Sequence, residues 1–221
     1  MEGSKLTEPA IKRTIAFFDG QNLFHAVKVA FGYRYPNYNV LKLADIICQG
    51  KGWNLAQTRF YTGVPDLQDN YRWHYFWTSK LAAMARQGVE IYSRKLVYRN
   101  KTVRLPDTWE SCCRGKQYTF LVGTEKGIDV RLALDVIRMA LRDDYDVALI
   151  FSQDQDLSEV ADEIRSIVES RGRWIKIASA YPSSPTYRNR RGIDKTDWIP
   201  IDRPTYDACT DPRDYRPKRK T

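Results

Sequence analysis

Two short apolar segments that each end in acidic and amide side chains constrain the fold of this chain most. Residues 14–18 read TIAFF and precede Asp19, and residues 147–151 read VALIF and precede the acidic segment 152–156, SQDQD. Neither run alternates apolar with polar residues, which indicates strands buried on both faces of a sheet. Ligands of open α/β sheets bind at the carboxyl ends of the strands. We therefore expect an α/β fold with an acidic site at that edge.

Strand and helix patterns alternate along most of the chain, which predicts a mostly parallel central sheet with helices on both faces, a three-layer α/β/α arrangement. The expected strands are residues 14–18, 57–61, 89–92, 147–151 and 174–178. The expected helices are residues 22–30, 40–48, 69–87, 128–141 and 157–171, each with apolar residues at helical spacing. No internal repeat and no second domain are expected.

Residues 93–125 interrupt this rhythm, and we expect them to form an inserted β-hairpin region at the rim of the sheet. The pair Asn100-Lys101 is a turn signal between two short strands, and residues 118–122 could form a third. The exposed hairpin could serve a homo-oligomer, another partner or a nucleic acid, and the sequence does not choose among them.

The two ends of the chain differ from the middle in composition. Residues 1–12 are expected to be a flexible leader before one domain at 13–181. Residues 182–221 form a basic tail rich in Pro, Arg and Tyr, in which residues 198–201 could add an edge strand.

The composition favours a protein of the cytoplasm, and its basic excess indicates either a polyanionic partner or simple solubility. The chain has 36 basic and 27 acidic residues, a formal net charge of +9, although its most suggestive strand ends are acidic. Enzymes that cut nucleic acids combine these features, because basic flanks bind phosphates and carboxylates bind metal. No apolar run reaches the roughly 18 residues needed to cross a membrane, and the N-terminus lacks the apolar core of a signal peptide.

The cysteines and histidines argue against zinc and against a disulfide framework. Cys48 and Cys209 are isolated, Cys112 and Cys113 are adjacent, and the chain has only two histidines. None of these spacings is that of a zinc site, so the adjacent pair is expected to be reduced surface thiols.

Four aspartates are candidate metal ligands: Asp19, Asp129, Asp154 and Asp156. Asp19 and Asp156 could instead cap the helices that follow them, and Asp129 lies in a first helical turn, where the helix dipole favours a carboxylate. Asp154 has no such local role, and its closeness to Asp156 costs free energy unless a cation offsets it.

Oxygen ligands without a histidine or cysteine cluster favour Mg²⁺ or Mn²⁺. Such ions activate water and stabilise the leaving oxygen in phosphodiester hydrolysis. Asp135 lies about 240° around the helix from Asp129, so we expect it in a supporting or structural role.

Three motifs carry a resemblance to a known family. Residues 17–22, FFDGQN, resemble the F-h-D-x-x-N opening of the NYN family of PIN-like nucleases. Residues 126–130, KGIDV, with Asp135 resemble its K-G-x-D…D helix, and residues 152–156 resemble its S-x-D-x-D motif. The motifs occur in the family's order, the resemblance covers residues 13–180, and the bacterial LabA-like branch is the most similar.

The resemblance implies a PIN-like (Rossmann-like) fold and a metal-dependent endoribonuclease that cuts single-stranded RNA. The implied acidic cluster is Asp19, Asp129, Asp154 and Asp156, binding Mg²⁺ or Mn²⁺. Asn22 would orient Asp19 or a water molecule, and Ser152 would support the site from the strand end. Apart from the resemblance, four basic residues are candidates for binding RNA phosphates, with plain solvation as the equal alternative: Lys126, Arg188, Arg190 and Arg191.

Other functions remain open at this point. An aspartyl-phosphate phosphatase would need a second Asp two residues after Asp19, where this chain has Gln21. An RNA-binding regulatory protein without turnover is a stronger rival, because the family usually has Gly at the position of Gln153. A nuclease toxin or defence effector would use the same chemistry in another biological role.

Overall fold

The centre of the computed structural model, which describes residues 6–104 and 116–217, is a six-stranded sheet in the order β3-β2-β1-β6-β7-β8. All of its neighbouring strands run parallel. The strands are β1 (Arg13–Asp19), β2 (Asn54–Val64), β3 (Glu90–Lys95), β6 (Val147–Phe151), β7 (Lys176–Pro182) and β8 (Asp197–Ile201). Because β1 and β6 are neighbours, the two acidic strand ends meet at one edge of the sheet.

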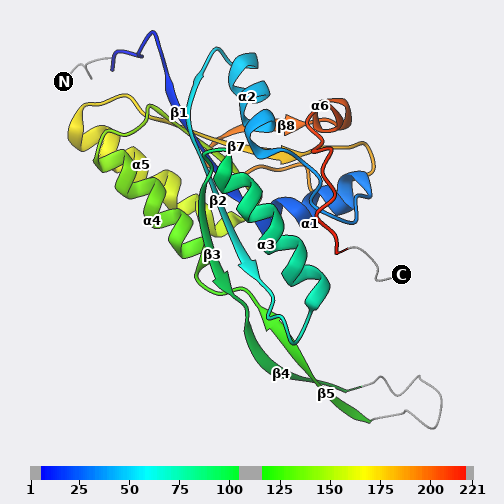
Figure 1. The fold of residues 1–221 in the computed structure, drawn as a ribbon. Coiled ribbons are helices and arrows are strands. Elements are labelled where there is room, and N and C mark those ends of the chain that lie inside the picture. Colours follow the sequence, from blue (N-terminus) through cyan, green and yellow to red (C-terminus); the bar gives the residue numbers. More distant parts are fainter. Residues whose placement is uncertain (1–5, 105–115, 218–221) are drawn as a thin grey trace.

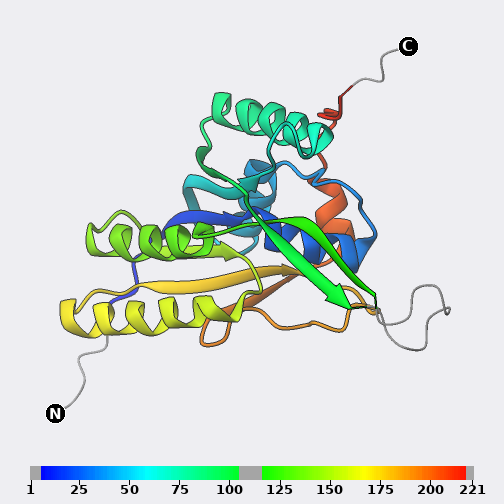
Figure 2. The ribbon, with the colours of Figure 1, turned by 90° about the horizontal axis from the view of Figure 1, so that it is seen from below.

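Helices cover both faces of this sheet, as Figures 1 and 2 show. One face packs against α1 (Gly20–Phe31), α2 (Val40–Gly50), α3 (Tyr71–Arg86) and α6 (Arg203–Ala208). The other face packs against α4 (Ile128–Leu141) and α5 (Ser158–Arg171), which follows the short 3₁₀ helix η1 (Gln155–Leu157). The predicted three-layer, mostly parallel α/β/α fold is confirmed.

The central strands are apolar throughout because successive side chains enter two different cores. In β1, Ala16 and Phe18 lie in the core under α1–α3, and Ile15 and Phe17 lie in the core under α4 and α5. Phe18 stacks on Phe151 of β6 with ring centroids 3.8 Å apart. The absence of apolar–polar alternation therefore follows from burial on both faces.

The inserted region is a two-stranded antiparallel ribbon, β4 (Val97–Arg104) with β5 (Gln117–Thr124), that projects away from the sheet (Figure 1). The predicted turn at Asn100-Lys101 is wrong, because Asn100 pairs with Leu121 in the middle of the ribbon. A polar pair in an exposed ribbon resembles a turn in sequence, since neither face of the ribbon is buried in a core. The connection, together with Cys112 and Cys113, lies outside the described residues.

The segment expected as a basic tail contributes to the fold. β8 provides the predicted edge strand at 198–201, whereas α6 was not anticipated. Tyr206, Cys209 and Tyr215 are buried in the core under α1–α3. In the described part of the chain no helix has the length and apolarity that crossing a membrane requires.

Candidate functional site

Asp19 is the innermost carboxylate of the acidic edge, with 5% of its surface exposed. It ends β1 and caps α1, since its Oδ1 accepts a hydrogen bond from the backbone N–H of Asn22 at 3.3 Å. Its Oδ2 accepts the hydroxyl hydrogen bond of Ser152 at 3.0 Å. The capping role and the predicted site role of Asp19 therefore coexist in one side chain.

Ser152 and Asn22 join the ends of β1 and β6. Ser152 directly follows Phe151, which pairs with Phe18 in the sheet, and this register brings its hydroxyl to Asp19. The side-chain Oδ1 of Asn22 accepts the backbone N–H of Gln153 at 2.9 Å. Asn22 therefore contacts Asp19 through its backbone, while its side chain fixes the loop after β6.

Asp154 has a local capping role that the sequence pattern did not indicate. Its Oδ1 accepts the backbone N–H of Asp156 at 3.1 Å and caps η1. Asp156 is exposed, and α5 begins at Ser158 without any side-chain cap, so the expected cap by Asp156 is absent. The 3₁₀ helix η1 lies between β6 and α5, so the capping residue is Asp154, two residues closer to β6 than Asp156.

Asp129 and Asp135 take different faces of α4. Asp129 is exposed in the first turn, after Gly127 opens the helix with a φ of 69°. Asp135 is buried and accepts hydrogen bonds from Tyr61 (3.0 Å) and Arg131 (3.0 Å). Burial opposes ionisation of Asp135, but these hydrogen bonds and the nearby arginine charges hold its pKa below the usual range. Asp135 thus pairs with protein groups away from Asp129.

Glu125 is an acidic residue of this edge that sequence reasoning missed. It directly follows β5, much as Asp19 ends β1, and its carboxylate accepts the backbone N–H of Gly63 at the end of β2. The position of an acid at the end of an apolar strand, one residue before the KGID motif, was the available signal. Its approach to Asp19 depends on how the ribbon returns to the sheet.

The carboxylates of Asp19, Glu125, Asp129 and Asp154, called the acidic site below, are close enough to affect one another. Burial raises the pKa of Asp19 to about 6, and the negative charges of Asp154 and Asp129 add to this against its hydrogen bonds. Burial likewise raises the pKa of Glu125 to about 7, with contributions from Asp19 and Asp129. Burial and nearby like charges therefore both disfavour the ionised forms of Asp19 and Glu125.

The acidic site lacks countercharges, since none of its carboxylates forms an ion pair within the described residues, whereas Asp135 and Asp146 do. Its donors are carboxylate oxygens, which fit a hard divalent cation such as Mg²⁺ or Mn²⁺. Across residues 6–104 and 116–217, however, no three His, Cys, Asp or Glu side chains are grouped tightly enough to hold a metal ion. The carboxylate oxygens therefore suit a divalent metal, but the described side chains are not close enough together to ligate one.

Two glutamines hold the connection between β7 and β8 against the loop after β6. The Nε2 of Gln153 donates to the carbonyl oxygens of Asn189 (3.2 Å) and Arg191 (2.7 Å), and its Oε1 accepts the Tyr187 hydroxyl (3.0 Å). Gln155 donates to the carbonyl of Gly192 at 2.9 Å. Gln153 therefore points into residues 187–192.

The four predicted phosphate-binding residues differ in how free their side chains are. Arg190 bonds back to the carbonyl of Pro185 (2.6 Å), and Arg191 pairs with Asp194 (2.7 Å). Lys126 and Arg188 are exposed and form no side-chain hydrogen bond or ion pair with any described residue. Of the four predicted cations, these two are the ones free to meet a phosphate.

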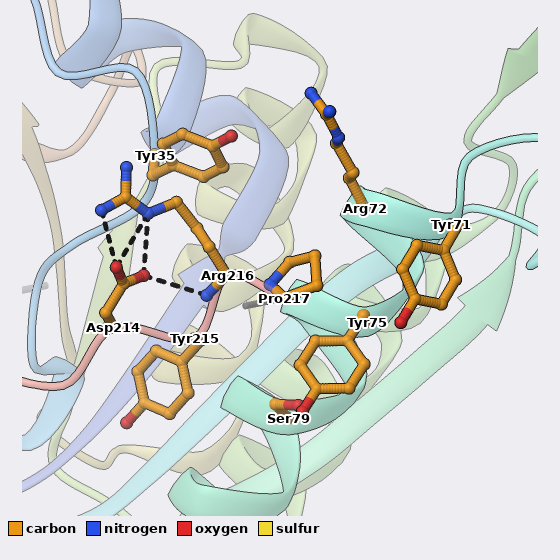
Figure 3. A pocket seen from close by; sticks show the side chains of 9 residues that line it. All are labelled: Tyr35, Tyr71, Arg72, Tyr75, Ser79, Asp214, Tyr215, Arg216 and Pro217. Atoms are coloured by element: carbon orange, nitrogen blue, oxygen red, sulfur yellow. Dashed lines mark hydrogen bonds and ion pairs between the residues drawn. The ribbon is translucent and has the colours of Figure 1, made fainter. Parts of the chain in front are cut away.

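A pocket of about 790 Å³ lies away from the acidic site, between the start of α3 and the C-terminal segment (Figure 3). Figure 3 shows Tyr35, Tyr71 and Tyr75 around it, with the guanidinium of Arg216 bound to the carboxylate of Asp214. None of the predicted site residues lines it. Its size therefore does not make it the place of the chemistry.

Comparisons with known proteins agree with this architecture. The family model described as "NYN domain" matches residues 13–190. A solved structure of VPA0982, a protein of unknown function from Vibrio parahaemolyticus, is similar in fold, with a TM-score of 0.52 and 16% identity over 89% of this chain and 97% of that chain.

A second solved structure, MurG from Acinetobacter baumannii, matches at a TM-score of 0.31 and 10% identity over 85% of this chain and 45% of that chain. A TM-score this low carries no argument about fold or function. No curated protein matches the sequence of this chain.

Proposed function

Since this chain belongs to the NYN domain family, we propose that it is a metal-dependent endoribonuclease that hydrolyses phosphodiester bonds of single-stranded RNA. Membership in the family implies a PIN-like fold of the nuclease type and supports hydrolase chemistry in general. The proposal adds the metal, the RNA substrate and the residues that act on it.

The observation that carries the proposal is a set of carboxylates at one sheet edge of a basic protein, none of which forms an ion pair with another described residue. Asp19 is almost fully buried beside Ser152, and this burial raises its pKa, with smaller contributions from the charges of Asp154 and Asp129. The protein nevertheless has a net charge of +9. A site that attracts a cation within a surface that attracts a polyanion is what cutting RNA requires.

In this proposal Asp19, Asp129 and Asp154 hold the cation through their carboxylate oxygens. A bound Mg²⁺ or Mn²⁺ would supply Lewis acidity and a water of lowered pKa for attack on the phosphorus, without a covalent enzyme intermediate. Ser152 fixes the orientation of Asp19, and Asn22 holds the loop that carries Asp154. Lys126 and Arg188 bind phosphates of the strand, and Asp156 remains a candidate ligand from the exposed side of η1.

An RNA-binding protein without turnover is the second candidate. The observation that favours it is that the described carboxylates do not form a group ready to hold a metal. Gln153 does not favour it, because its side chain is bonded to residues 187–191.

The test is cleavage of a labelled single-stranded RNA with Mg²⁺, Mn²⁺ or EDTA by the wild-type protein and by Asp154→Asn. We expect cutting that needs the metal and falls at least about 100-fold in the variant, more than the losses typical of residues that only support a metal site. Asp45→Asn is the matched control, because Asp45 is exposed on α2 and should leave the rate unchanged.

Each other outcome has a defined meaning. Cutting that survives Asp154→Asn would reject the acidic site as its origin. RNA that is bound but never cut with either metal would replace the nuclease by the binding protein. A DNA strand of the same sequence, cut as fast as the RNA, would remove the preference for RNA.

A further inference from the structure

A second pocket, of about 380 Å³, is lined by residues of α1, the start of α3 and the base of the β4–β5 ribbon. Its walls include Gln21, Phe24, Lys28, Arg34, Trp73 and Glu125. The volume lies within the range of about 300–1,000 Å³ that is usual for small-molecule sites. We call it the Trp73 pocket.

The Trp73 pocket adjoins the acidic site. Gln21 lies two residues after Asp19, and its Nε2 donates to the carbonyl of Gly63 at 3.2 Å. The backbone N–H of the same Gly63 donates to Glu125, whose carboxylate feels the charges of Asp19 and Asp129. A group bound in the pocket would therefore lie next to a strand held at the acidic site.

The apolar wall of the pocket is aromatic. Trp73 is half-buried, and its ring centroid lies 5.5 Å from that of Phe24 and 5.0 Å from that of Tyr35. Phe76 and Trp77 on the same helix are buried, as the helical spacing predicted. Trp73 and Trp77 both line the pocket, and Trp73 is the one of the two that is only half-buried. A partly exposed indole beside a pocket open to solvent suits base stacking.

The rim of the pocket is basic. Lys28 and Arg34 are exposed, and among the described residues neither side chain forms a hydrogen bond or an ion pair. Aromatic faces beside free cations are the combination by which proteins hold single-stranded nucleic acids, through base stacking and phosphate contacts. Gln21 and Glu125 add polar groups that can meet the edge of a base.

We infer that the Trp73 pocket binds one unpaired nucleobase of the substrate strand, which stacks on Trp73 while Lys28 and Arg34 contact the flanking phosphates. This inference rests on the proposed function for the identity of the strand. It adds a base-binding site at a fixed distance from the acidic site, so that one position of the RNA is held by its base.

The test measures binding in EDTA, so that no cleavage interferes, with single-stranded RNA oligomers of about ten nucleotides. An abasic nucleotide replaces each position in turn. We expect one position at which loss of the base weakens binding by about 10–100-fold, with small effects elsewhere. In Trp73→Leu, which keeps a large apolar side chain, this position should lose its special effect, and Trp73→Phe should keep it.

Trp53→Leu is the matched control, because Trp53 is a half-buried tryptophan before β2, at the end of the sheet opposite the acidic site. An equal effect of the abasic nucleotide at every position of the wild-type complex would overturn the inference, and this result needs no variant. Position dependence that persists in Trp73→Leu would overturn it as well.

The inference and the proposed function fail separately. Position-dependent binding without any metal-dependent cutting would sustain the base pocket and reject the nuclease. Cutting that depends on Asp154, by a protein that treats all abasic positions alike, would sustain the nuclease and reject the pocket.

Discussion

At the scale of single residues, the surroundings of Asp19 have opposing effects on the free energy of its charged form. Its carboxylate caps α1 and accepts the Ser152 hydroxyl, and both contacts favour the charged form. Burial and the neighbouring Asp154 and Asp129 disfavour that form and raise its pKa to about 6. Asp19 also has no cationic partner in residues 6–104 and 116–217. A buried charge that is costly in this way is typical of functional sites, where stability is lowered for the sake of chemistry.

We predict that Asp19→Asn makes the metal-free protein more stable at pH 8. The pKa of Asp19 in the folded state, about 6, exceeds its ordinary value of 3.8. The folded state therefore binds the proton more tightly, and stability present below about pH 4 is lost as the pH rises through 6. Asn does not titrate and caps a helix equally well.

The expected gain is about 1–3 kcal/mol in the free energy of unfolding at pH 8, shrinking towards zero at pH 4. Urea denaturation in EDTA at both pH values measures it, and exposed Asp156→Asn is the control that should show no such trend. A variant that is less stable by the same amount at both pH values would contradict the prediction.

At the scale of elements, the acidic loop after β6 and the basic connection between β7 and β8 form one unit. The side chains of Gln153 and Gln155 bridge them at backbone carbonyls from Asn189 to Gly192. The side-chain amide of Gln153 thus holds the basic residues 187–191 beside the acidic site, and a Gly at this position has no side chain to do so.

We predict that Gln153→Ala loosens residues 187–191 without unfolding the sheet. The change removes three hydrogen bonds, each worth about 0.5–1.5 kcal/mol, so opening of this loop should rise by at least ~10-fold. Limited proteolysis with trypsin, read by mass spectrometry, should show earlier cleavage after Arg188 and Arg190, and RNA binding should weaken.

Gln49→Ala is the control for that experiment. Gln49 bonds to Asp45 on the surface of α2, far along the chain from the basic loop, so its loss should leave the cleavage pattern unchanged. Identical protection of residues 187–191 in wild type and Gln153→Ala would show that other contacts hold the loop.

At the scale of the whole molecule, the C-terminal segment closes the core on the face of α1, α2 and α3. Tyr206 of α6 is fully buried, with its ring centroid 5.3 Å from Phe31, and its hydroxyl donates to Asn37 at 2.8 Å. Lys80 of α3 is also buried and donates to the carbonyl of Tyr38 (2.9 Å). With Cys209 and Tyr215 also buried, residues 206–215 contribute to the domain's core.

We predict that Tyr206→Ala lowers the free energy of unfolding by about 3–5 kcal/mol, the usual cost of emptying a large aromatic site. Tyr206→Phe should cost only about 0.5–1.5 kcal/mol, because it removes the hydrogen bond to Asn37 and keeps the ring. Chemical denaturation of both variants measures these two losses in the free energy of unfolding. A loss below about 1 kcal/mol in Tyr206→Ala would mean that the segment does not support the core.

Local pattern allowed much of the fold to be predicted. The helix at 128–141 and the strand at 147–151 lie where the sequence predicted them. Helical spacing of apolar residues marks the helix and an unbroken apolar run marks the buried strand, and both patterns are local. The meeting of Asp19 with Ser152 also follows from sequence, once the two buried strands are taken as neighbours. The acidic character of this sheet edge is therefore encoded in two local segments of the sequence.

Only the tertiary structure decided which distant groups complete that edge. It brought Glu125 to Asp19, turned Gln153 into the basic loop, and buried Tyr206 in a segment that reads as a polar tail. It also continued strand β4 through Asn100, where the sequence predicted a turn. These features depend on how elements far apart in the chain pack, and local residue patterns do not encode that packing.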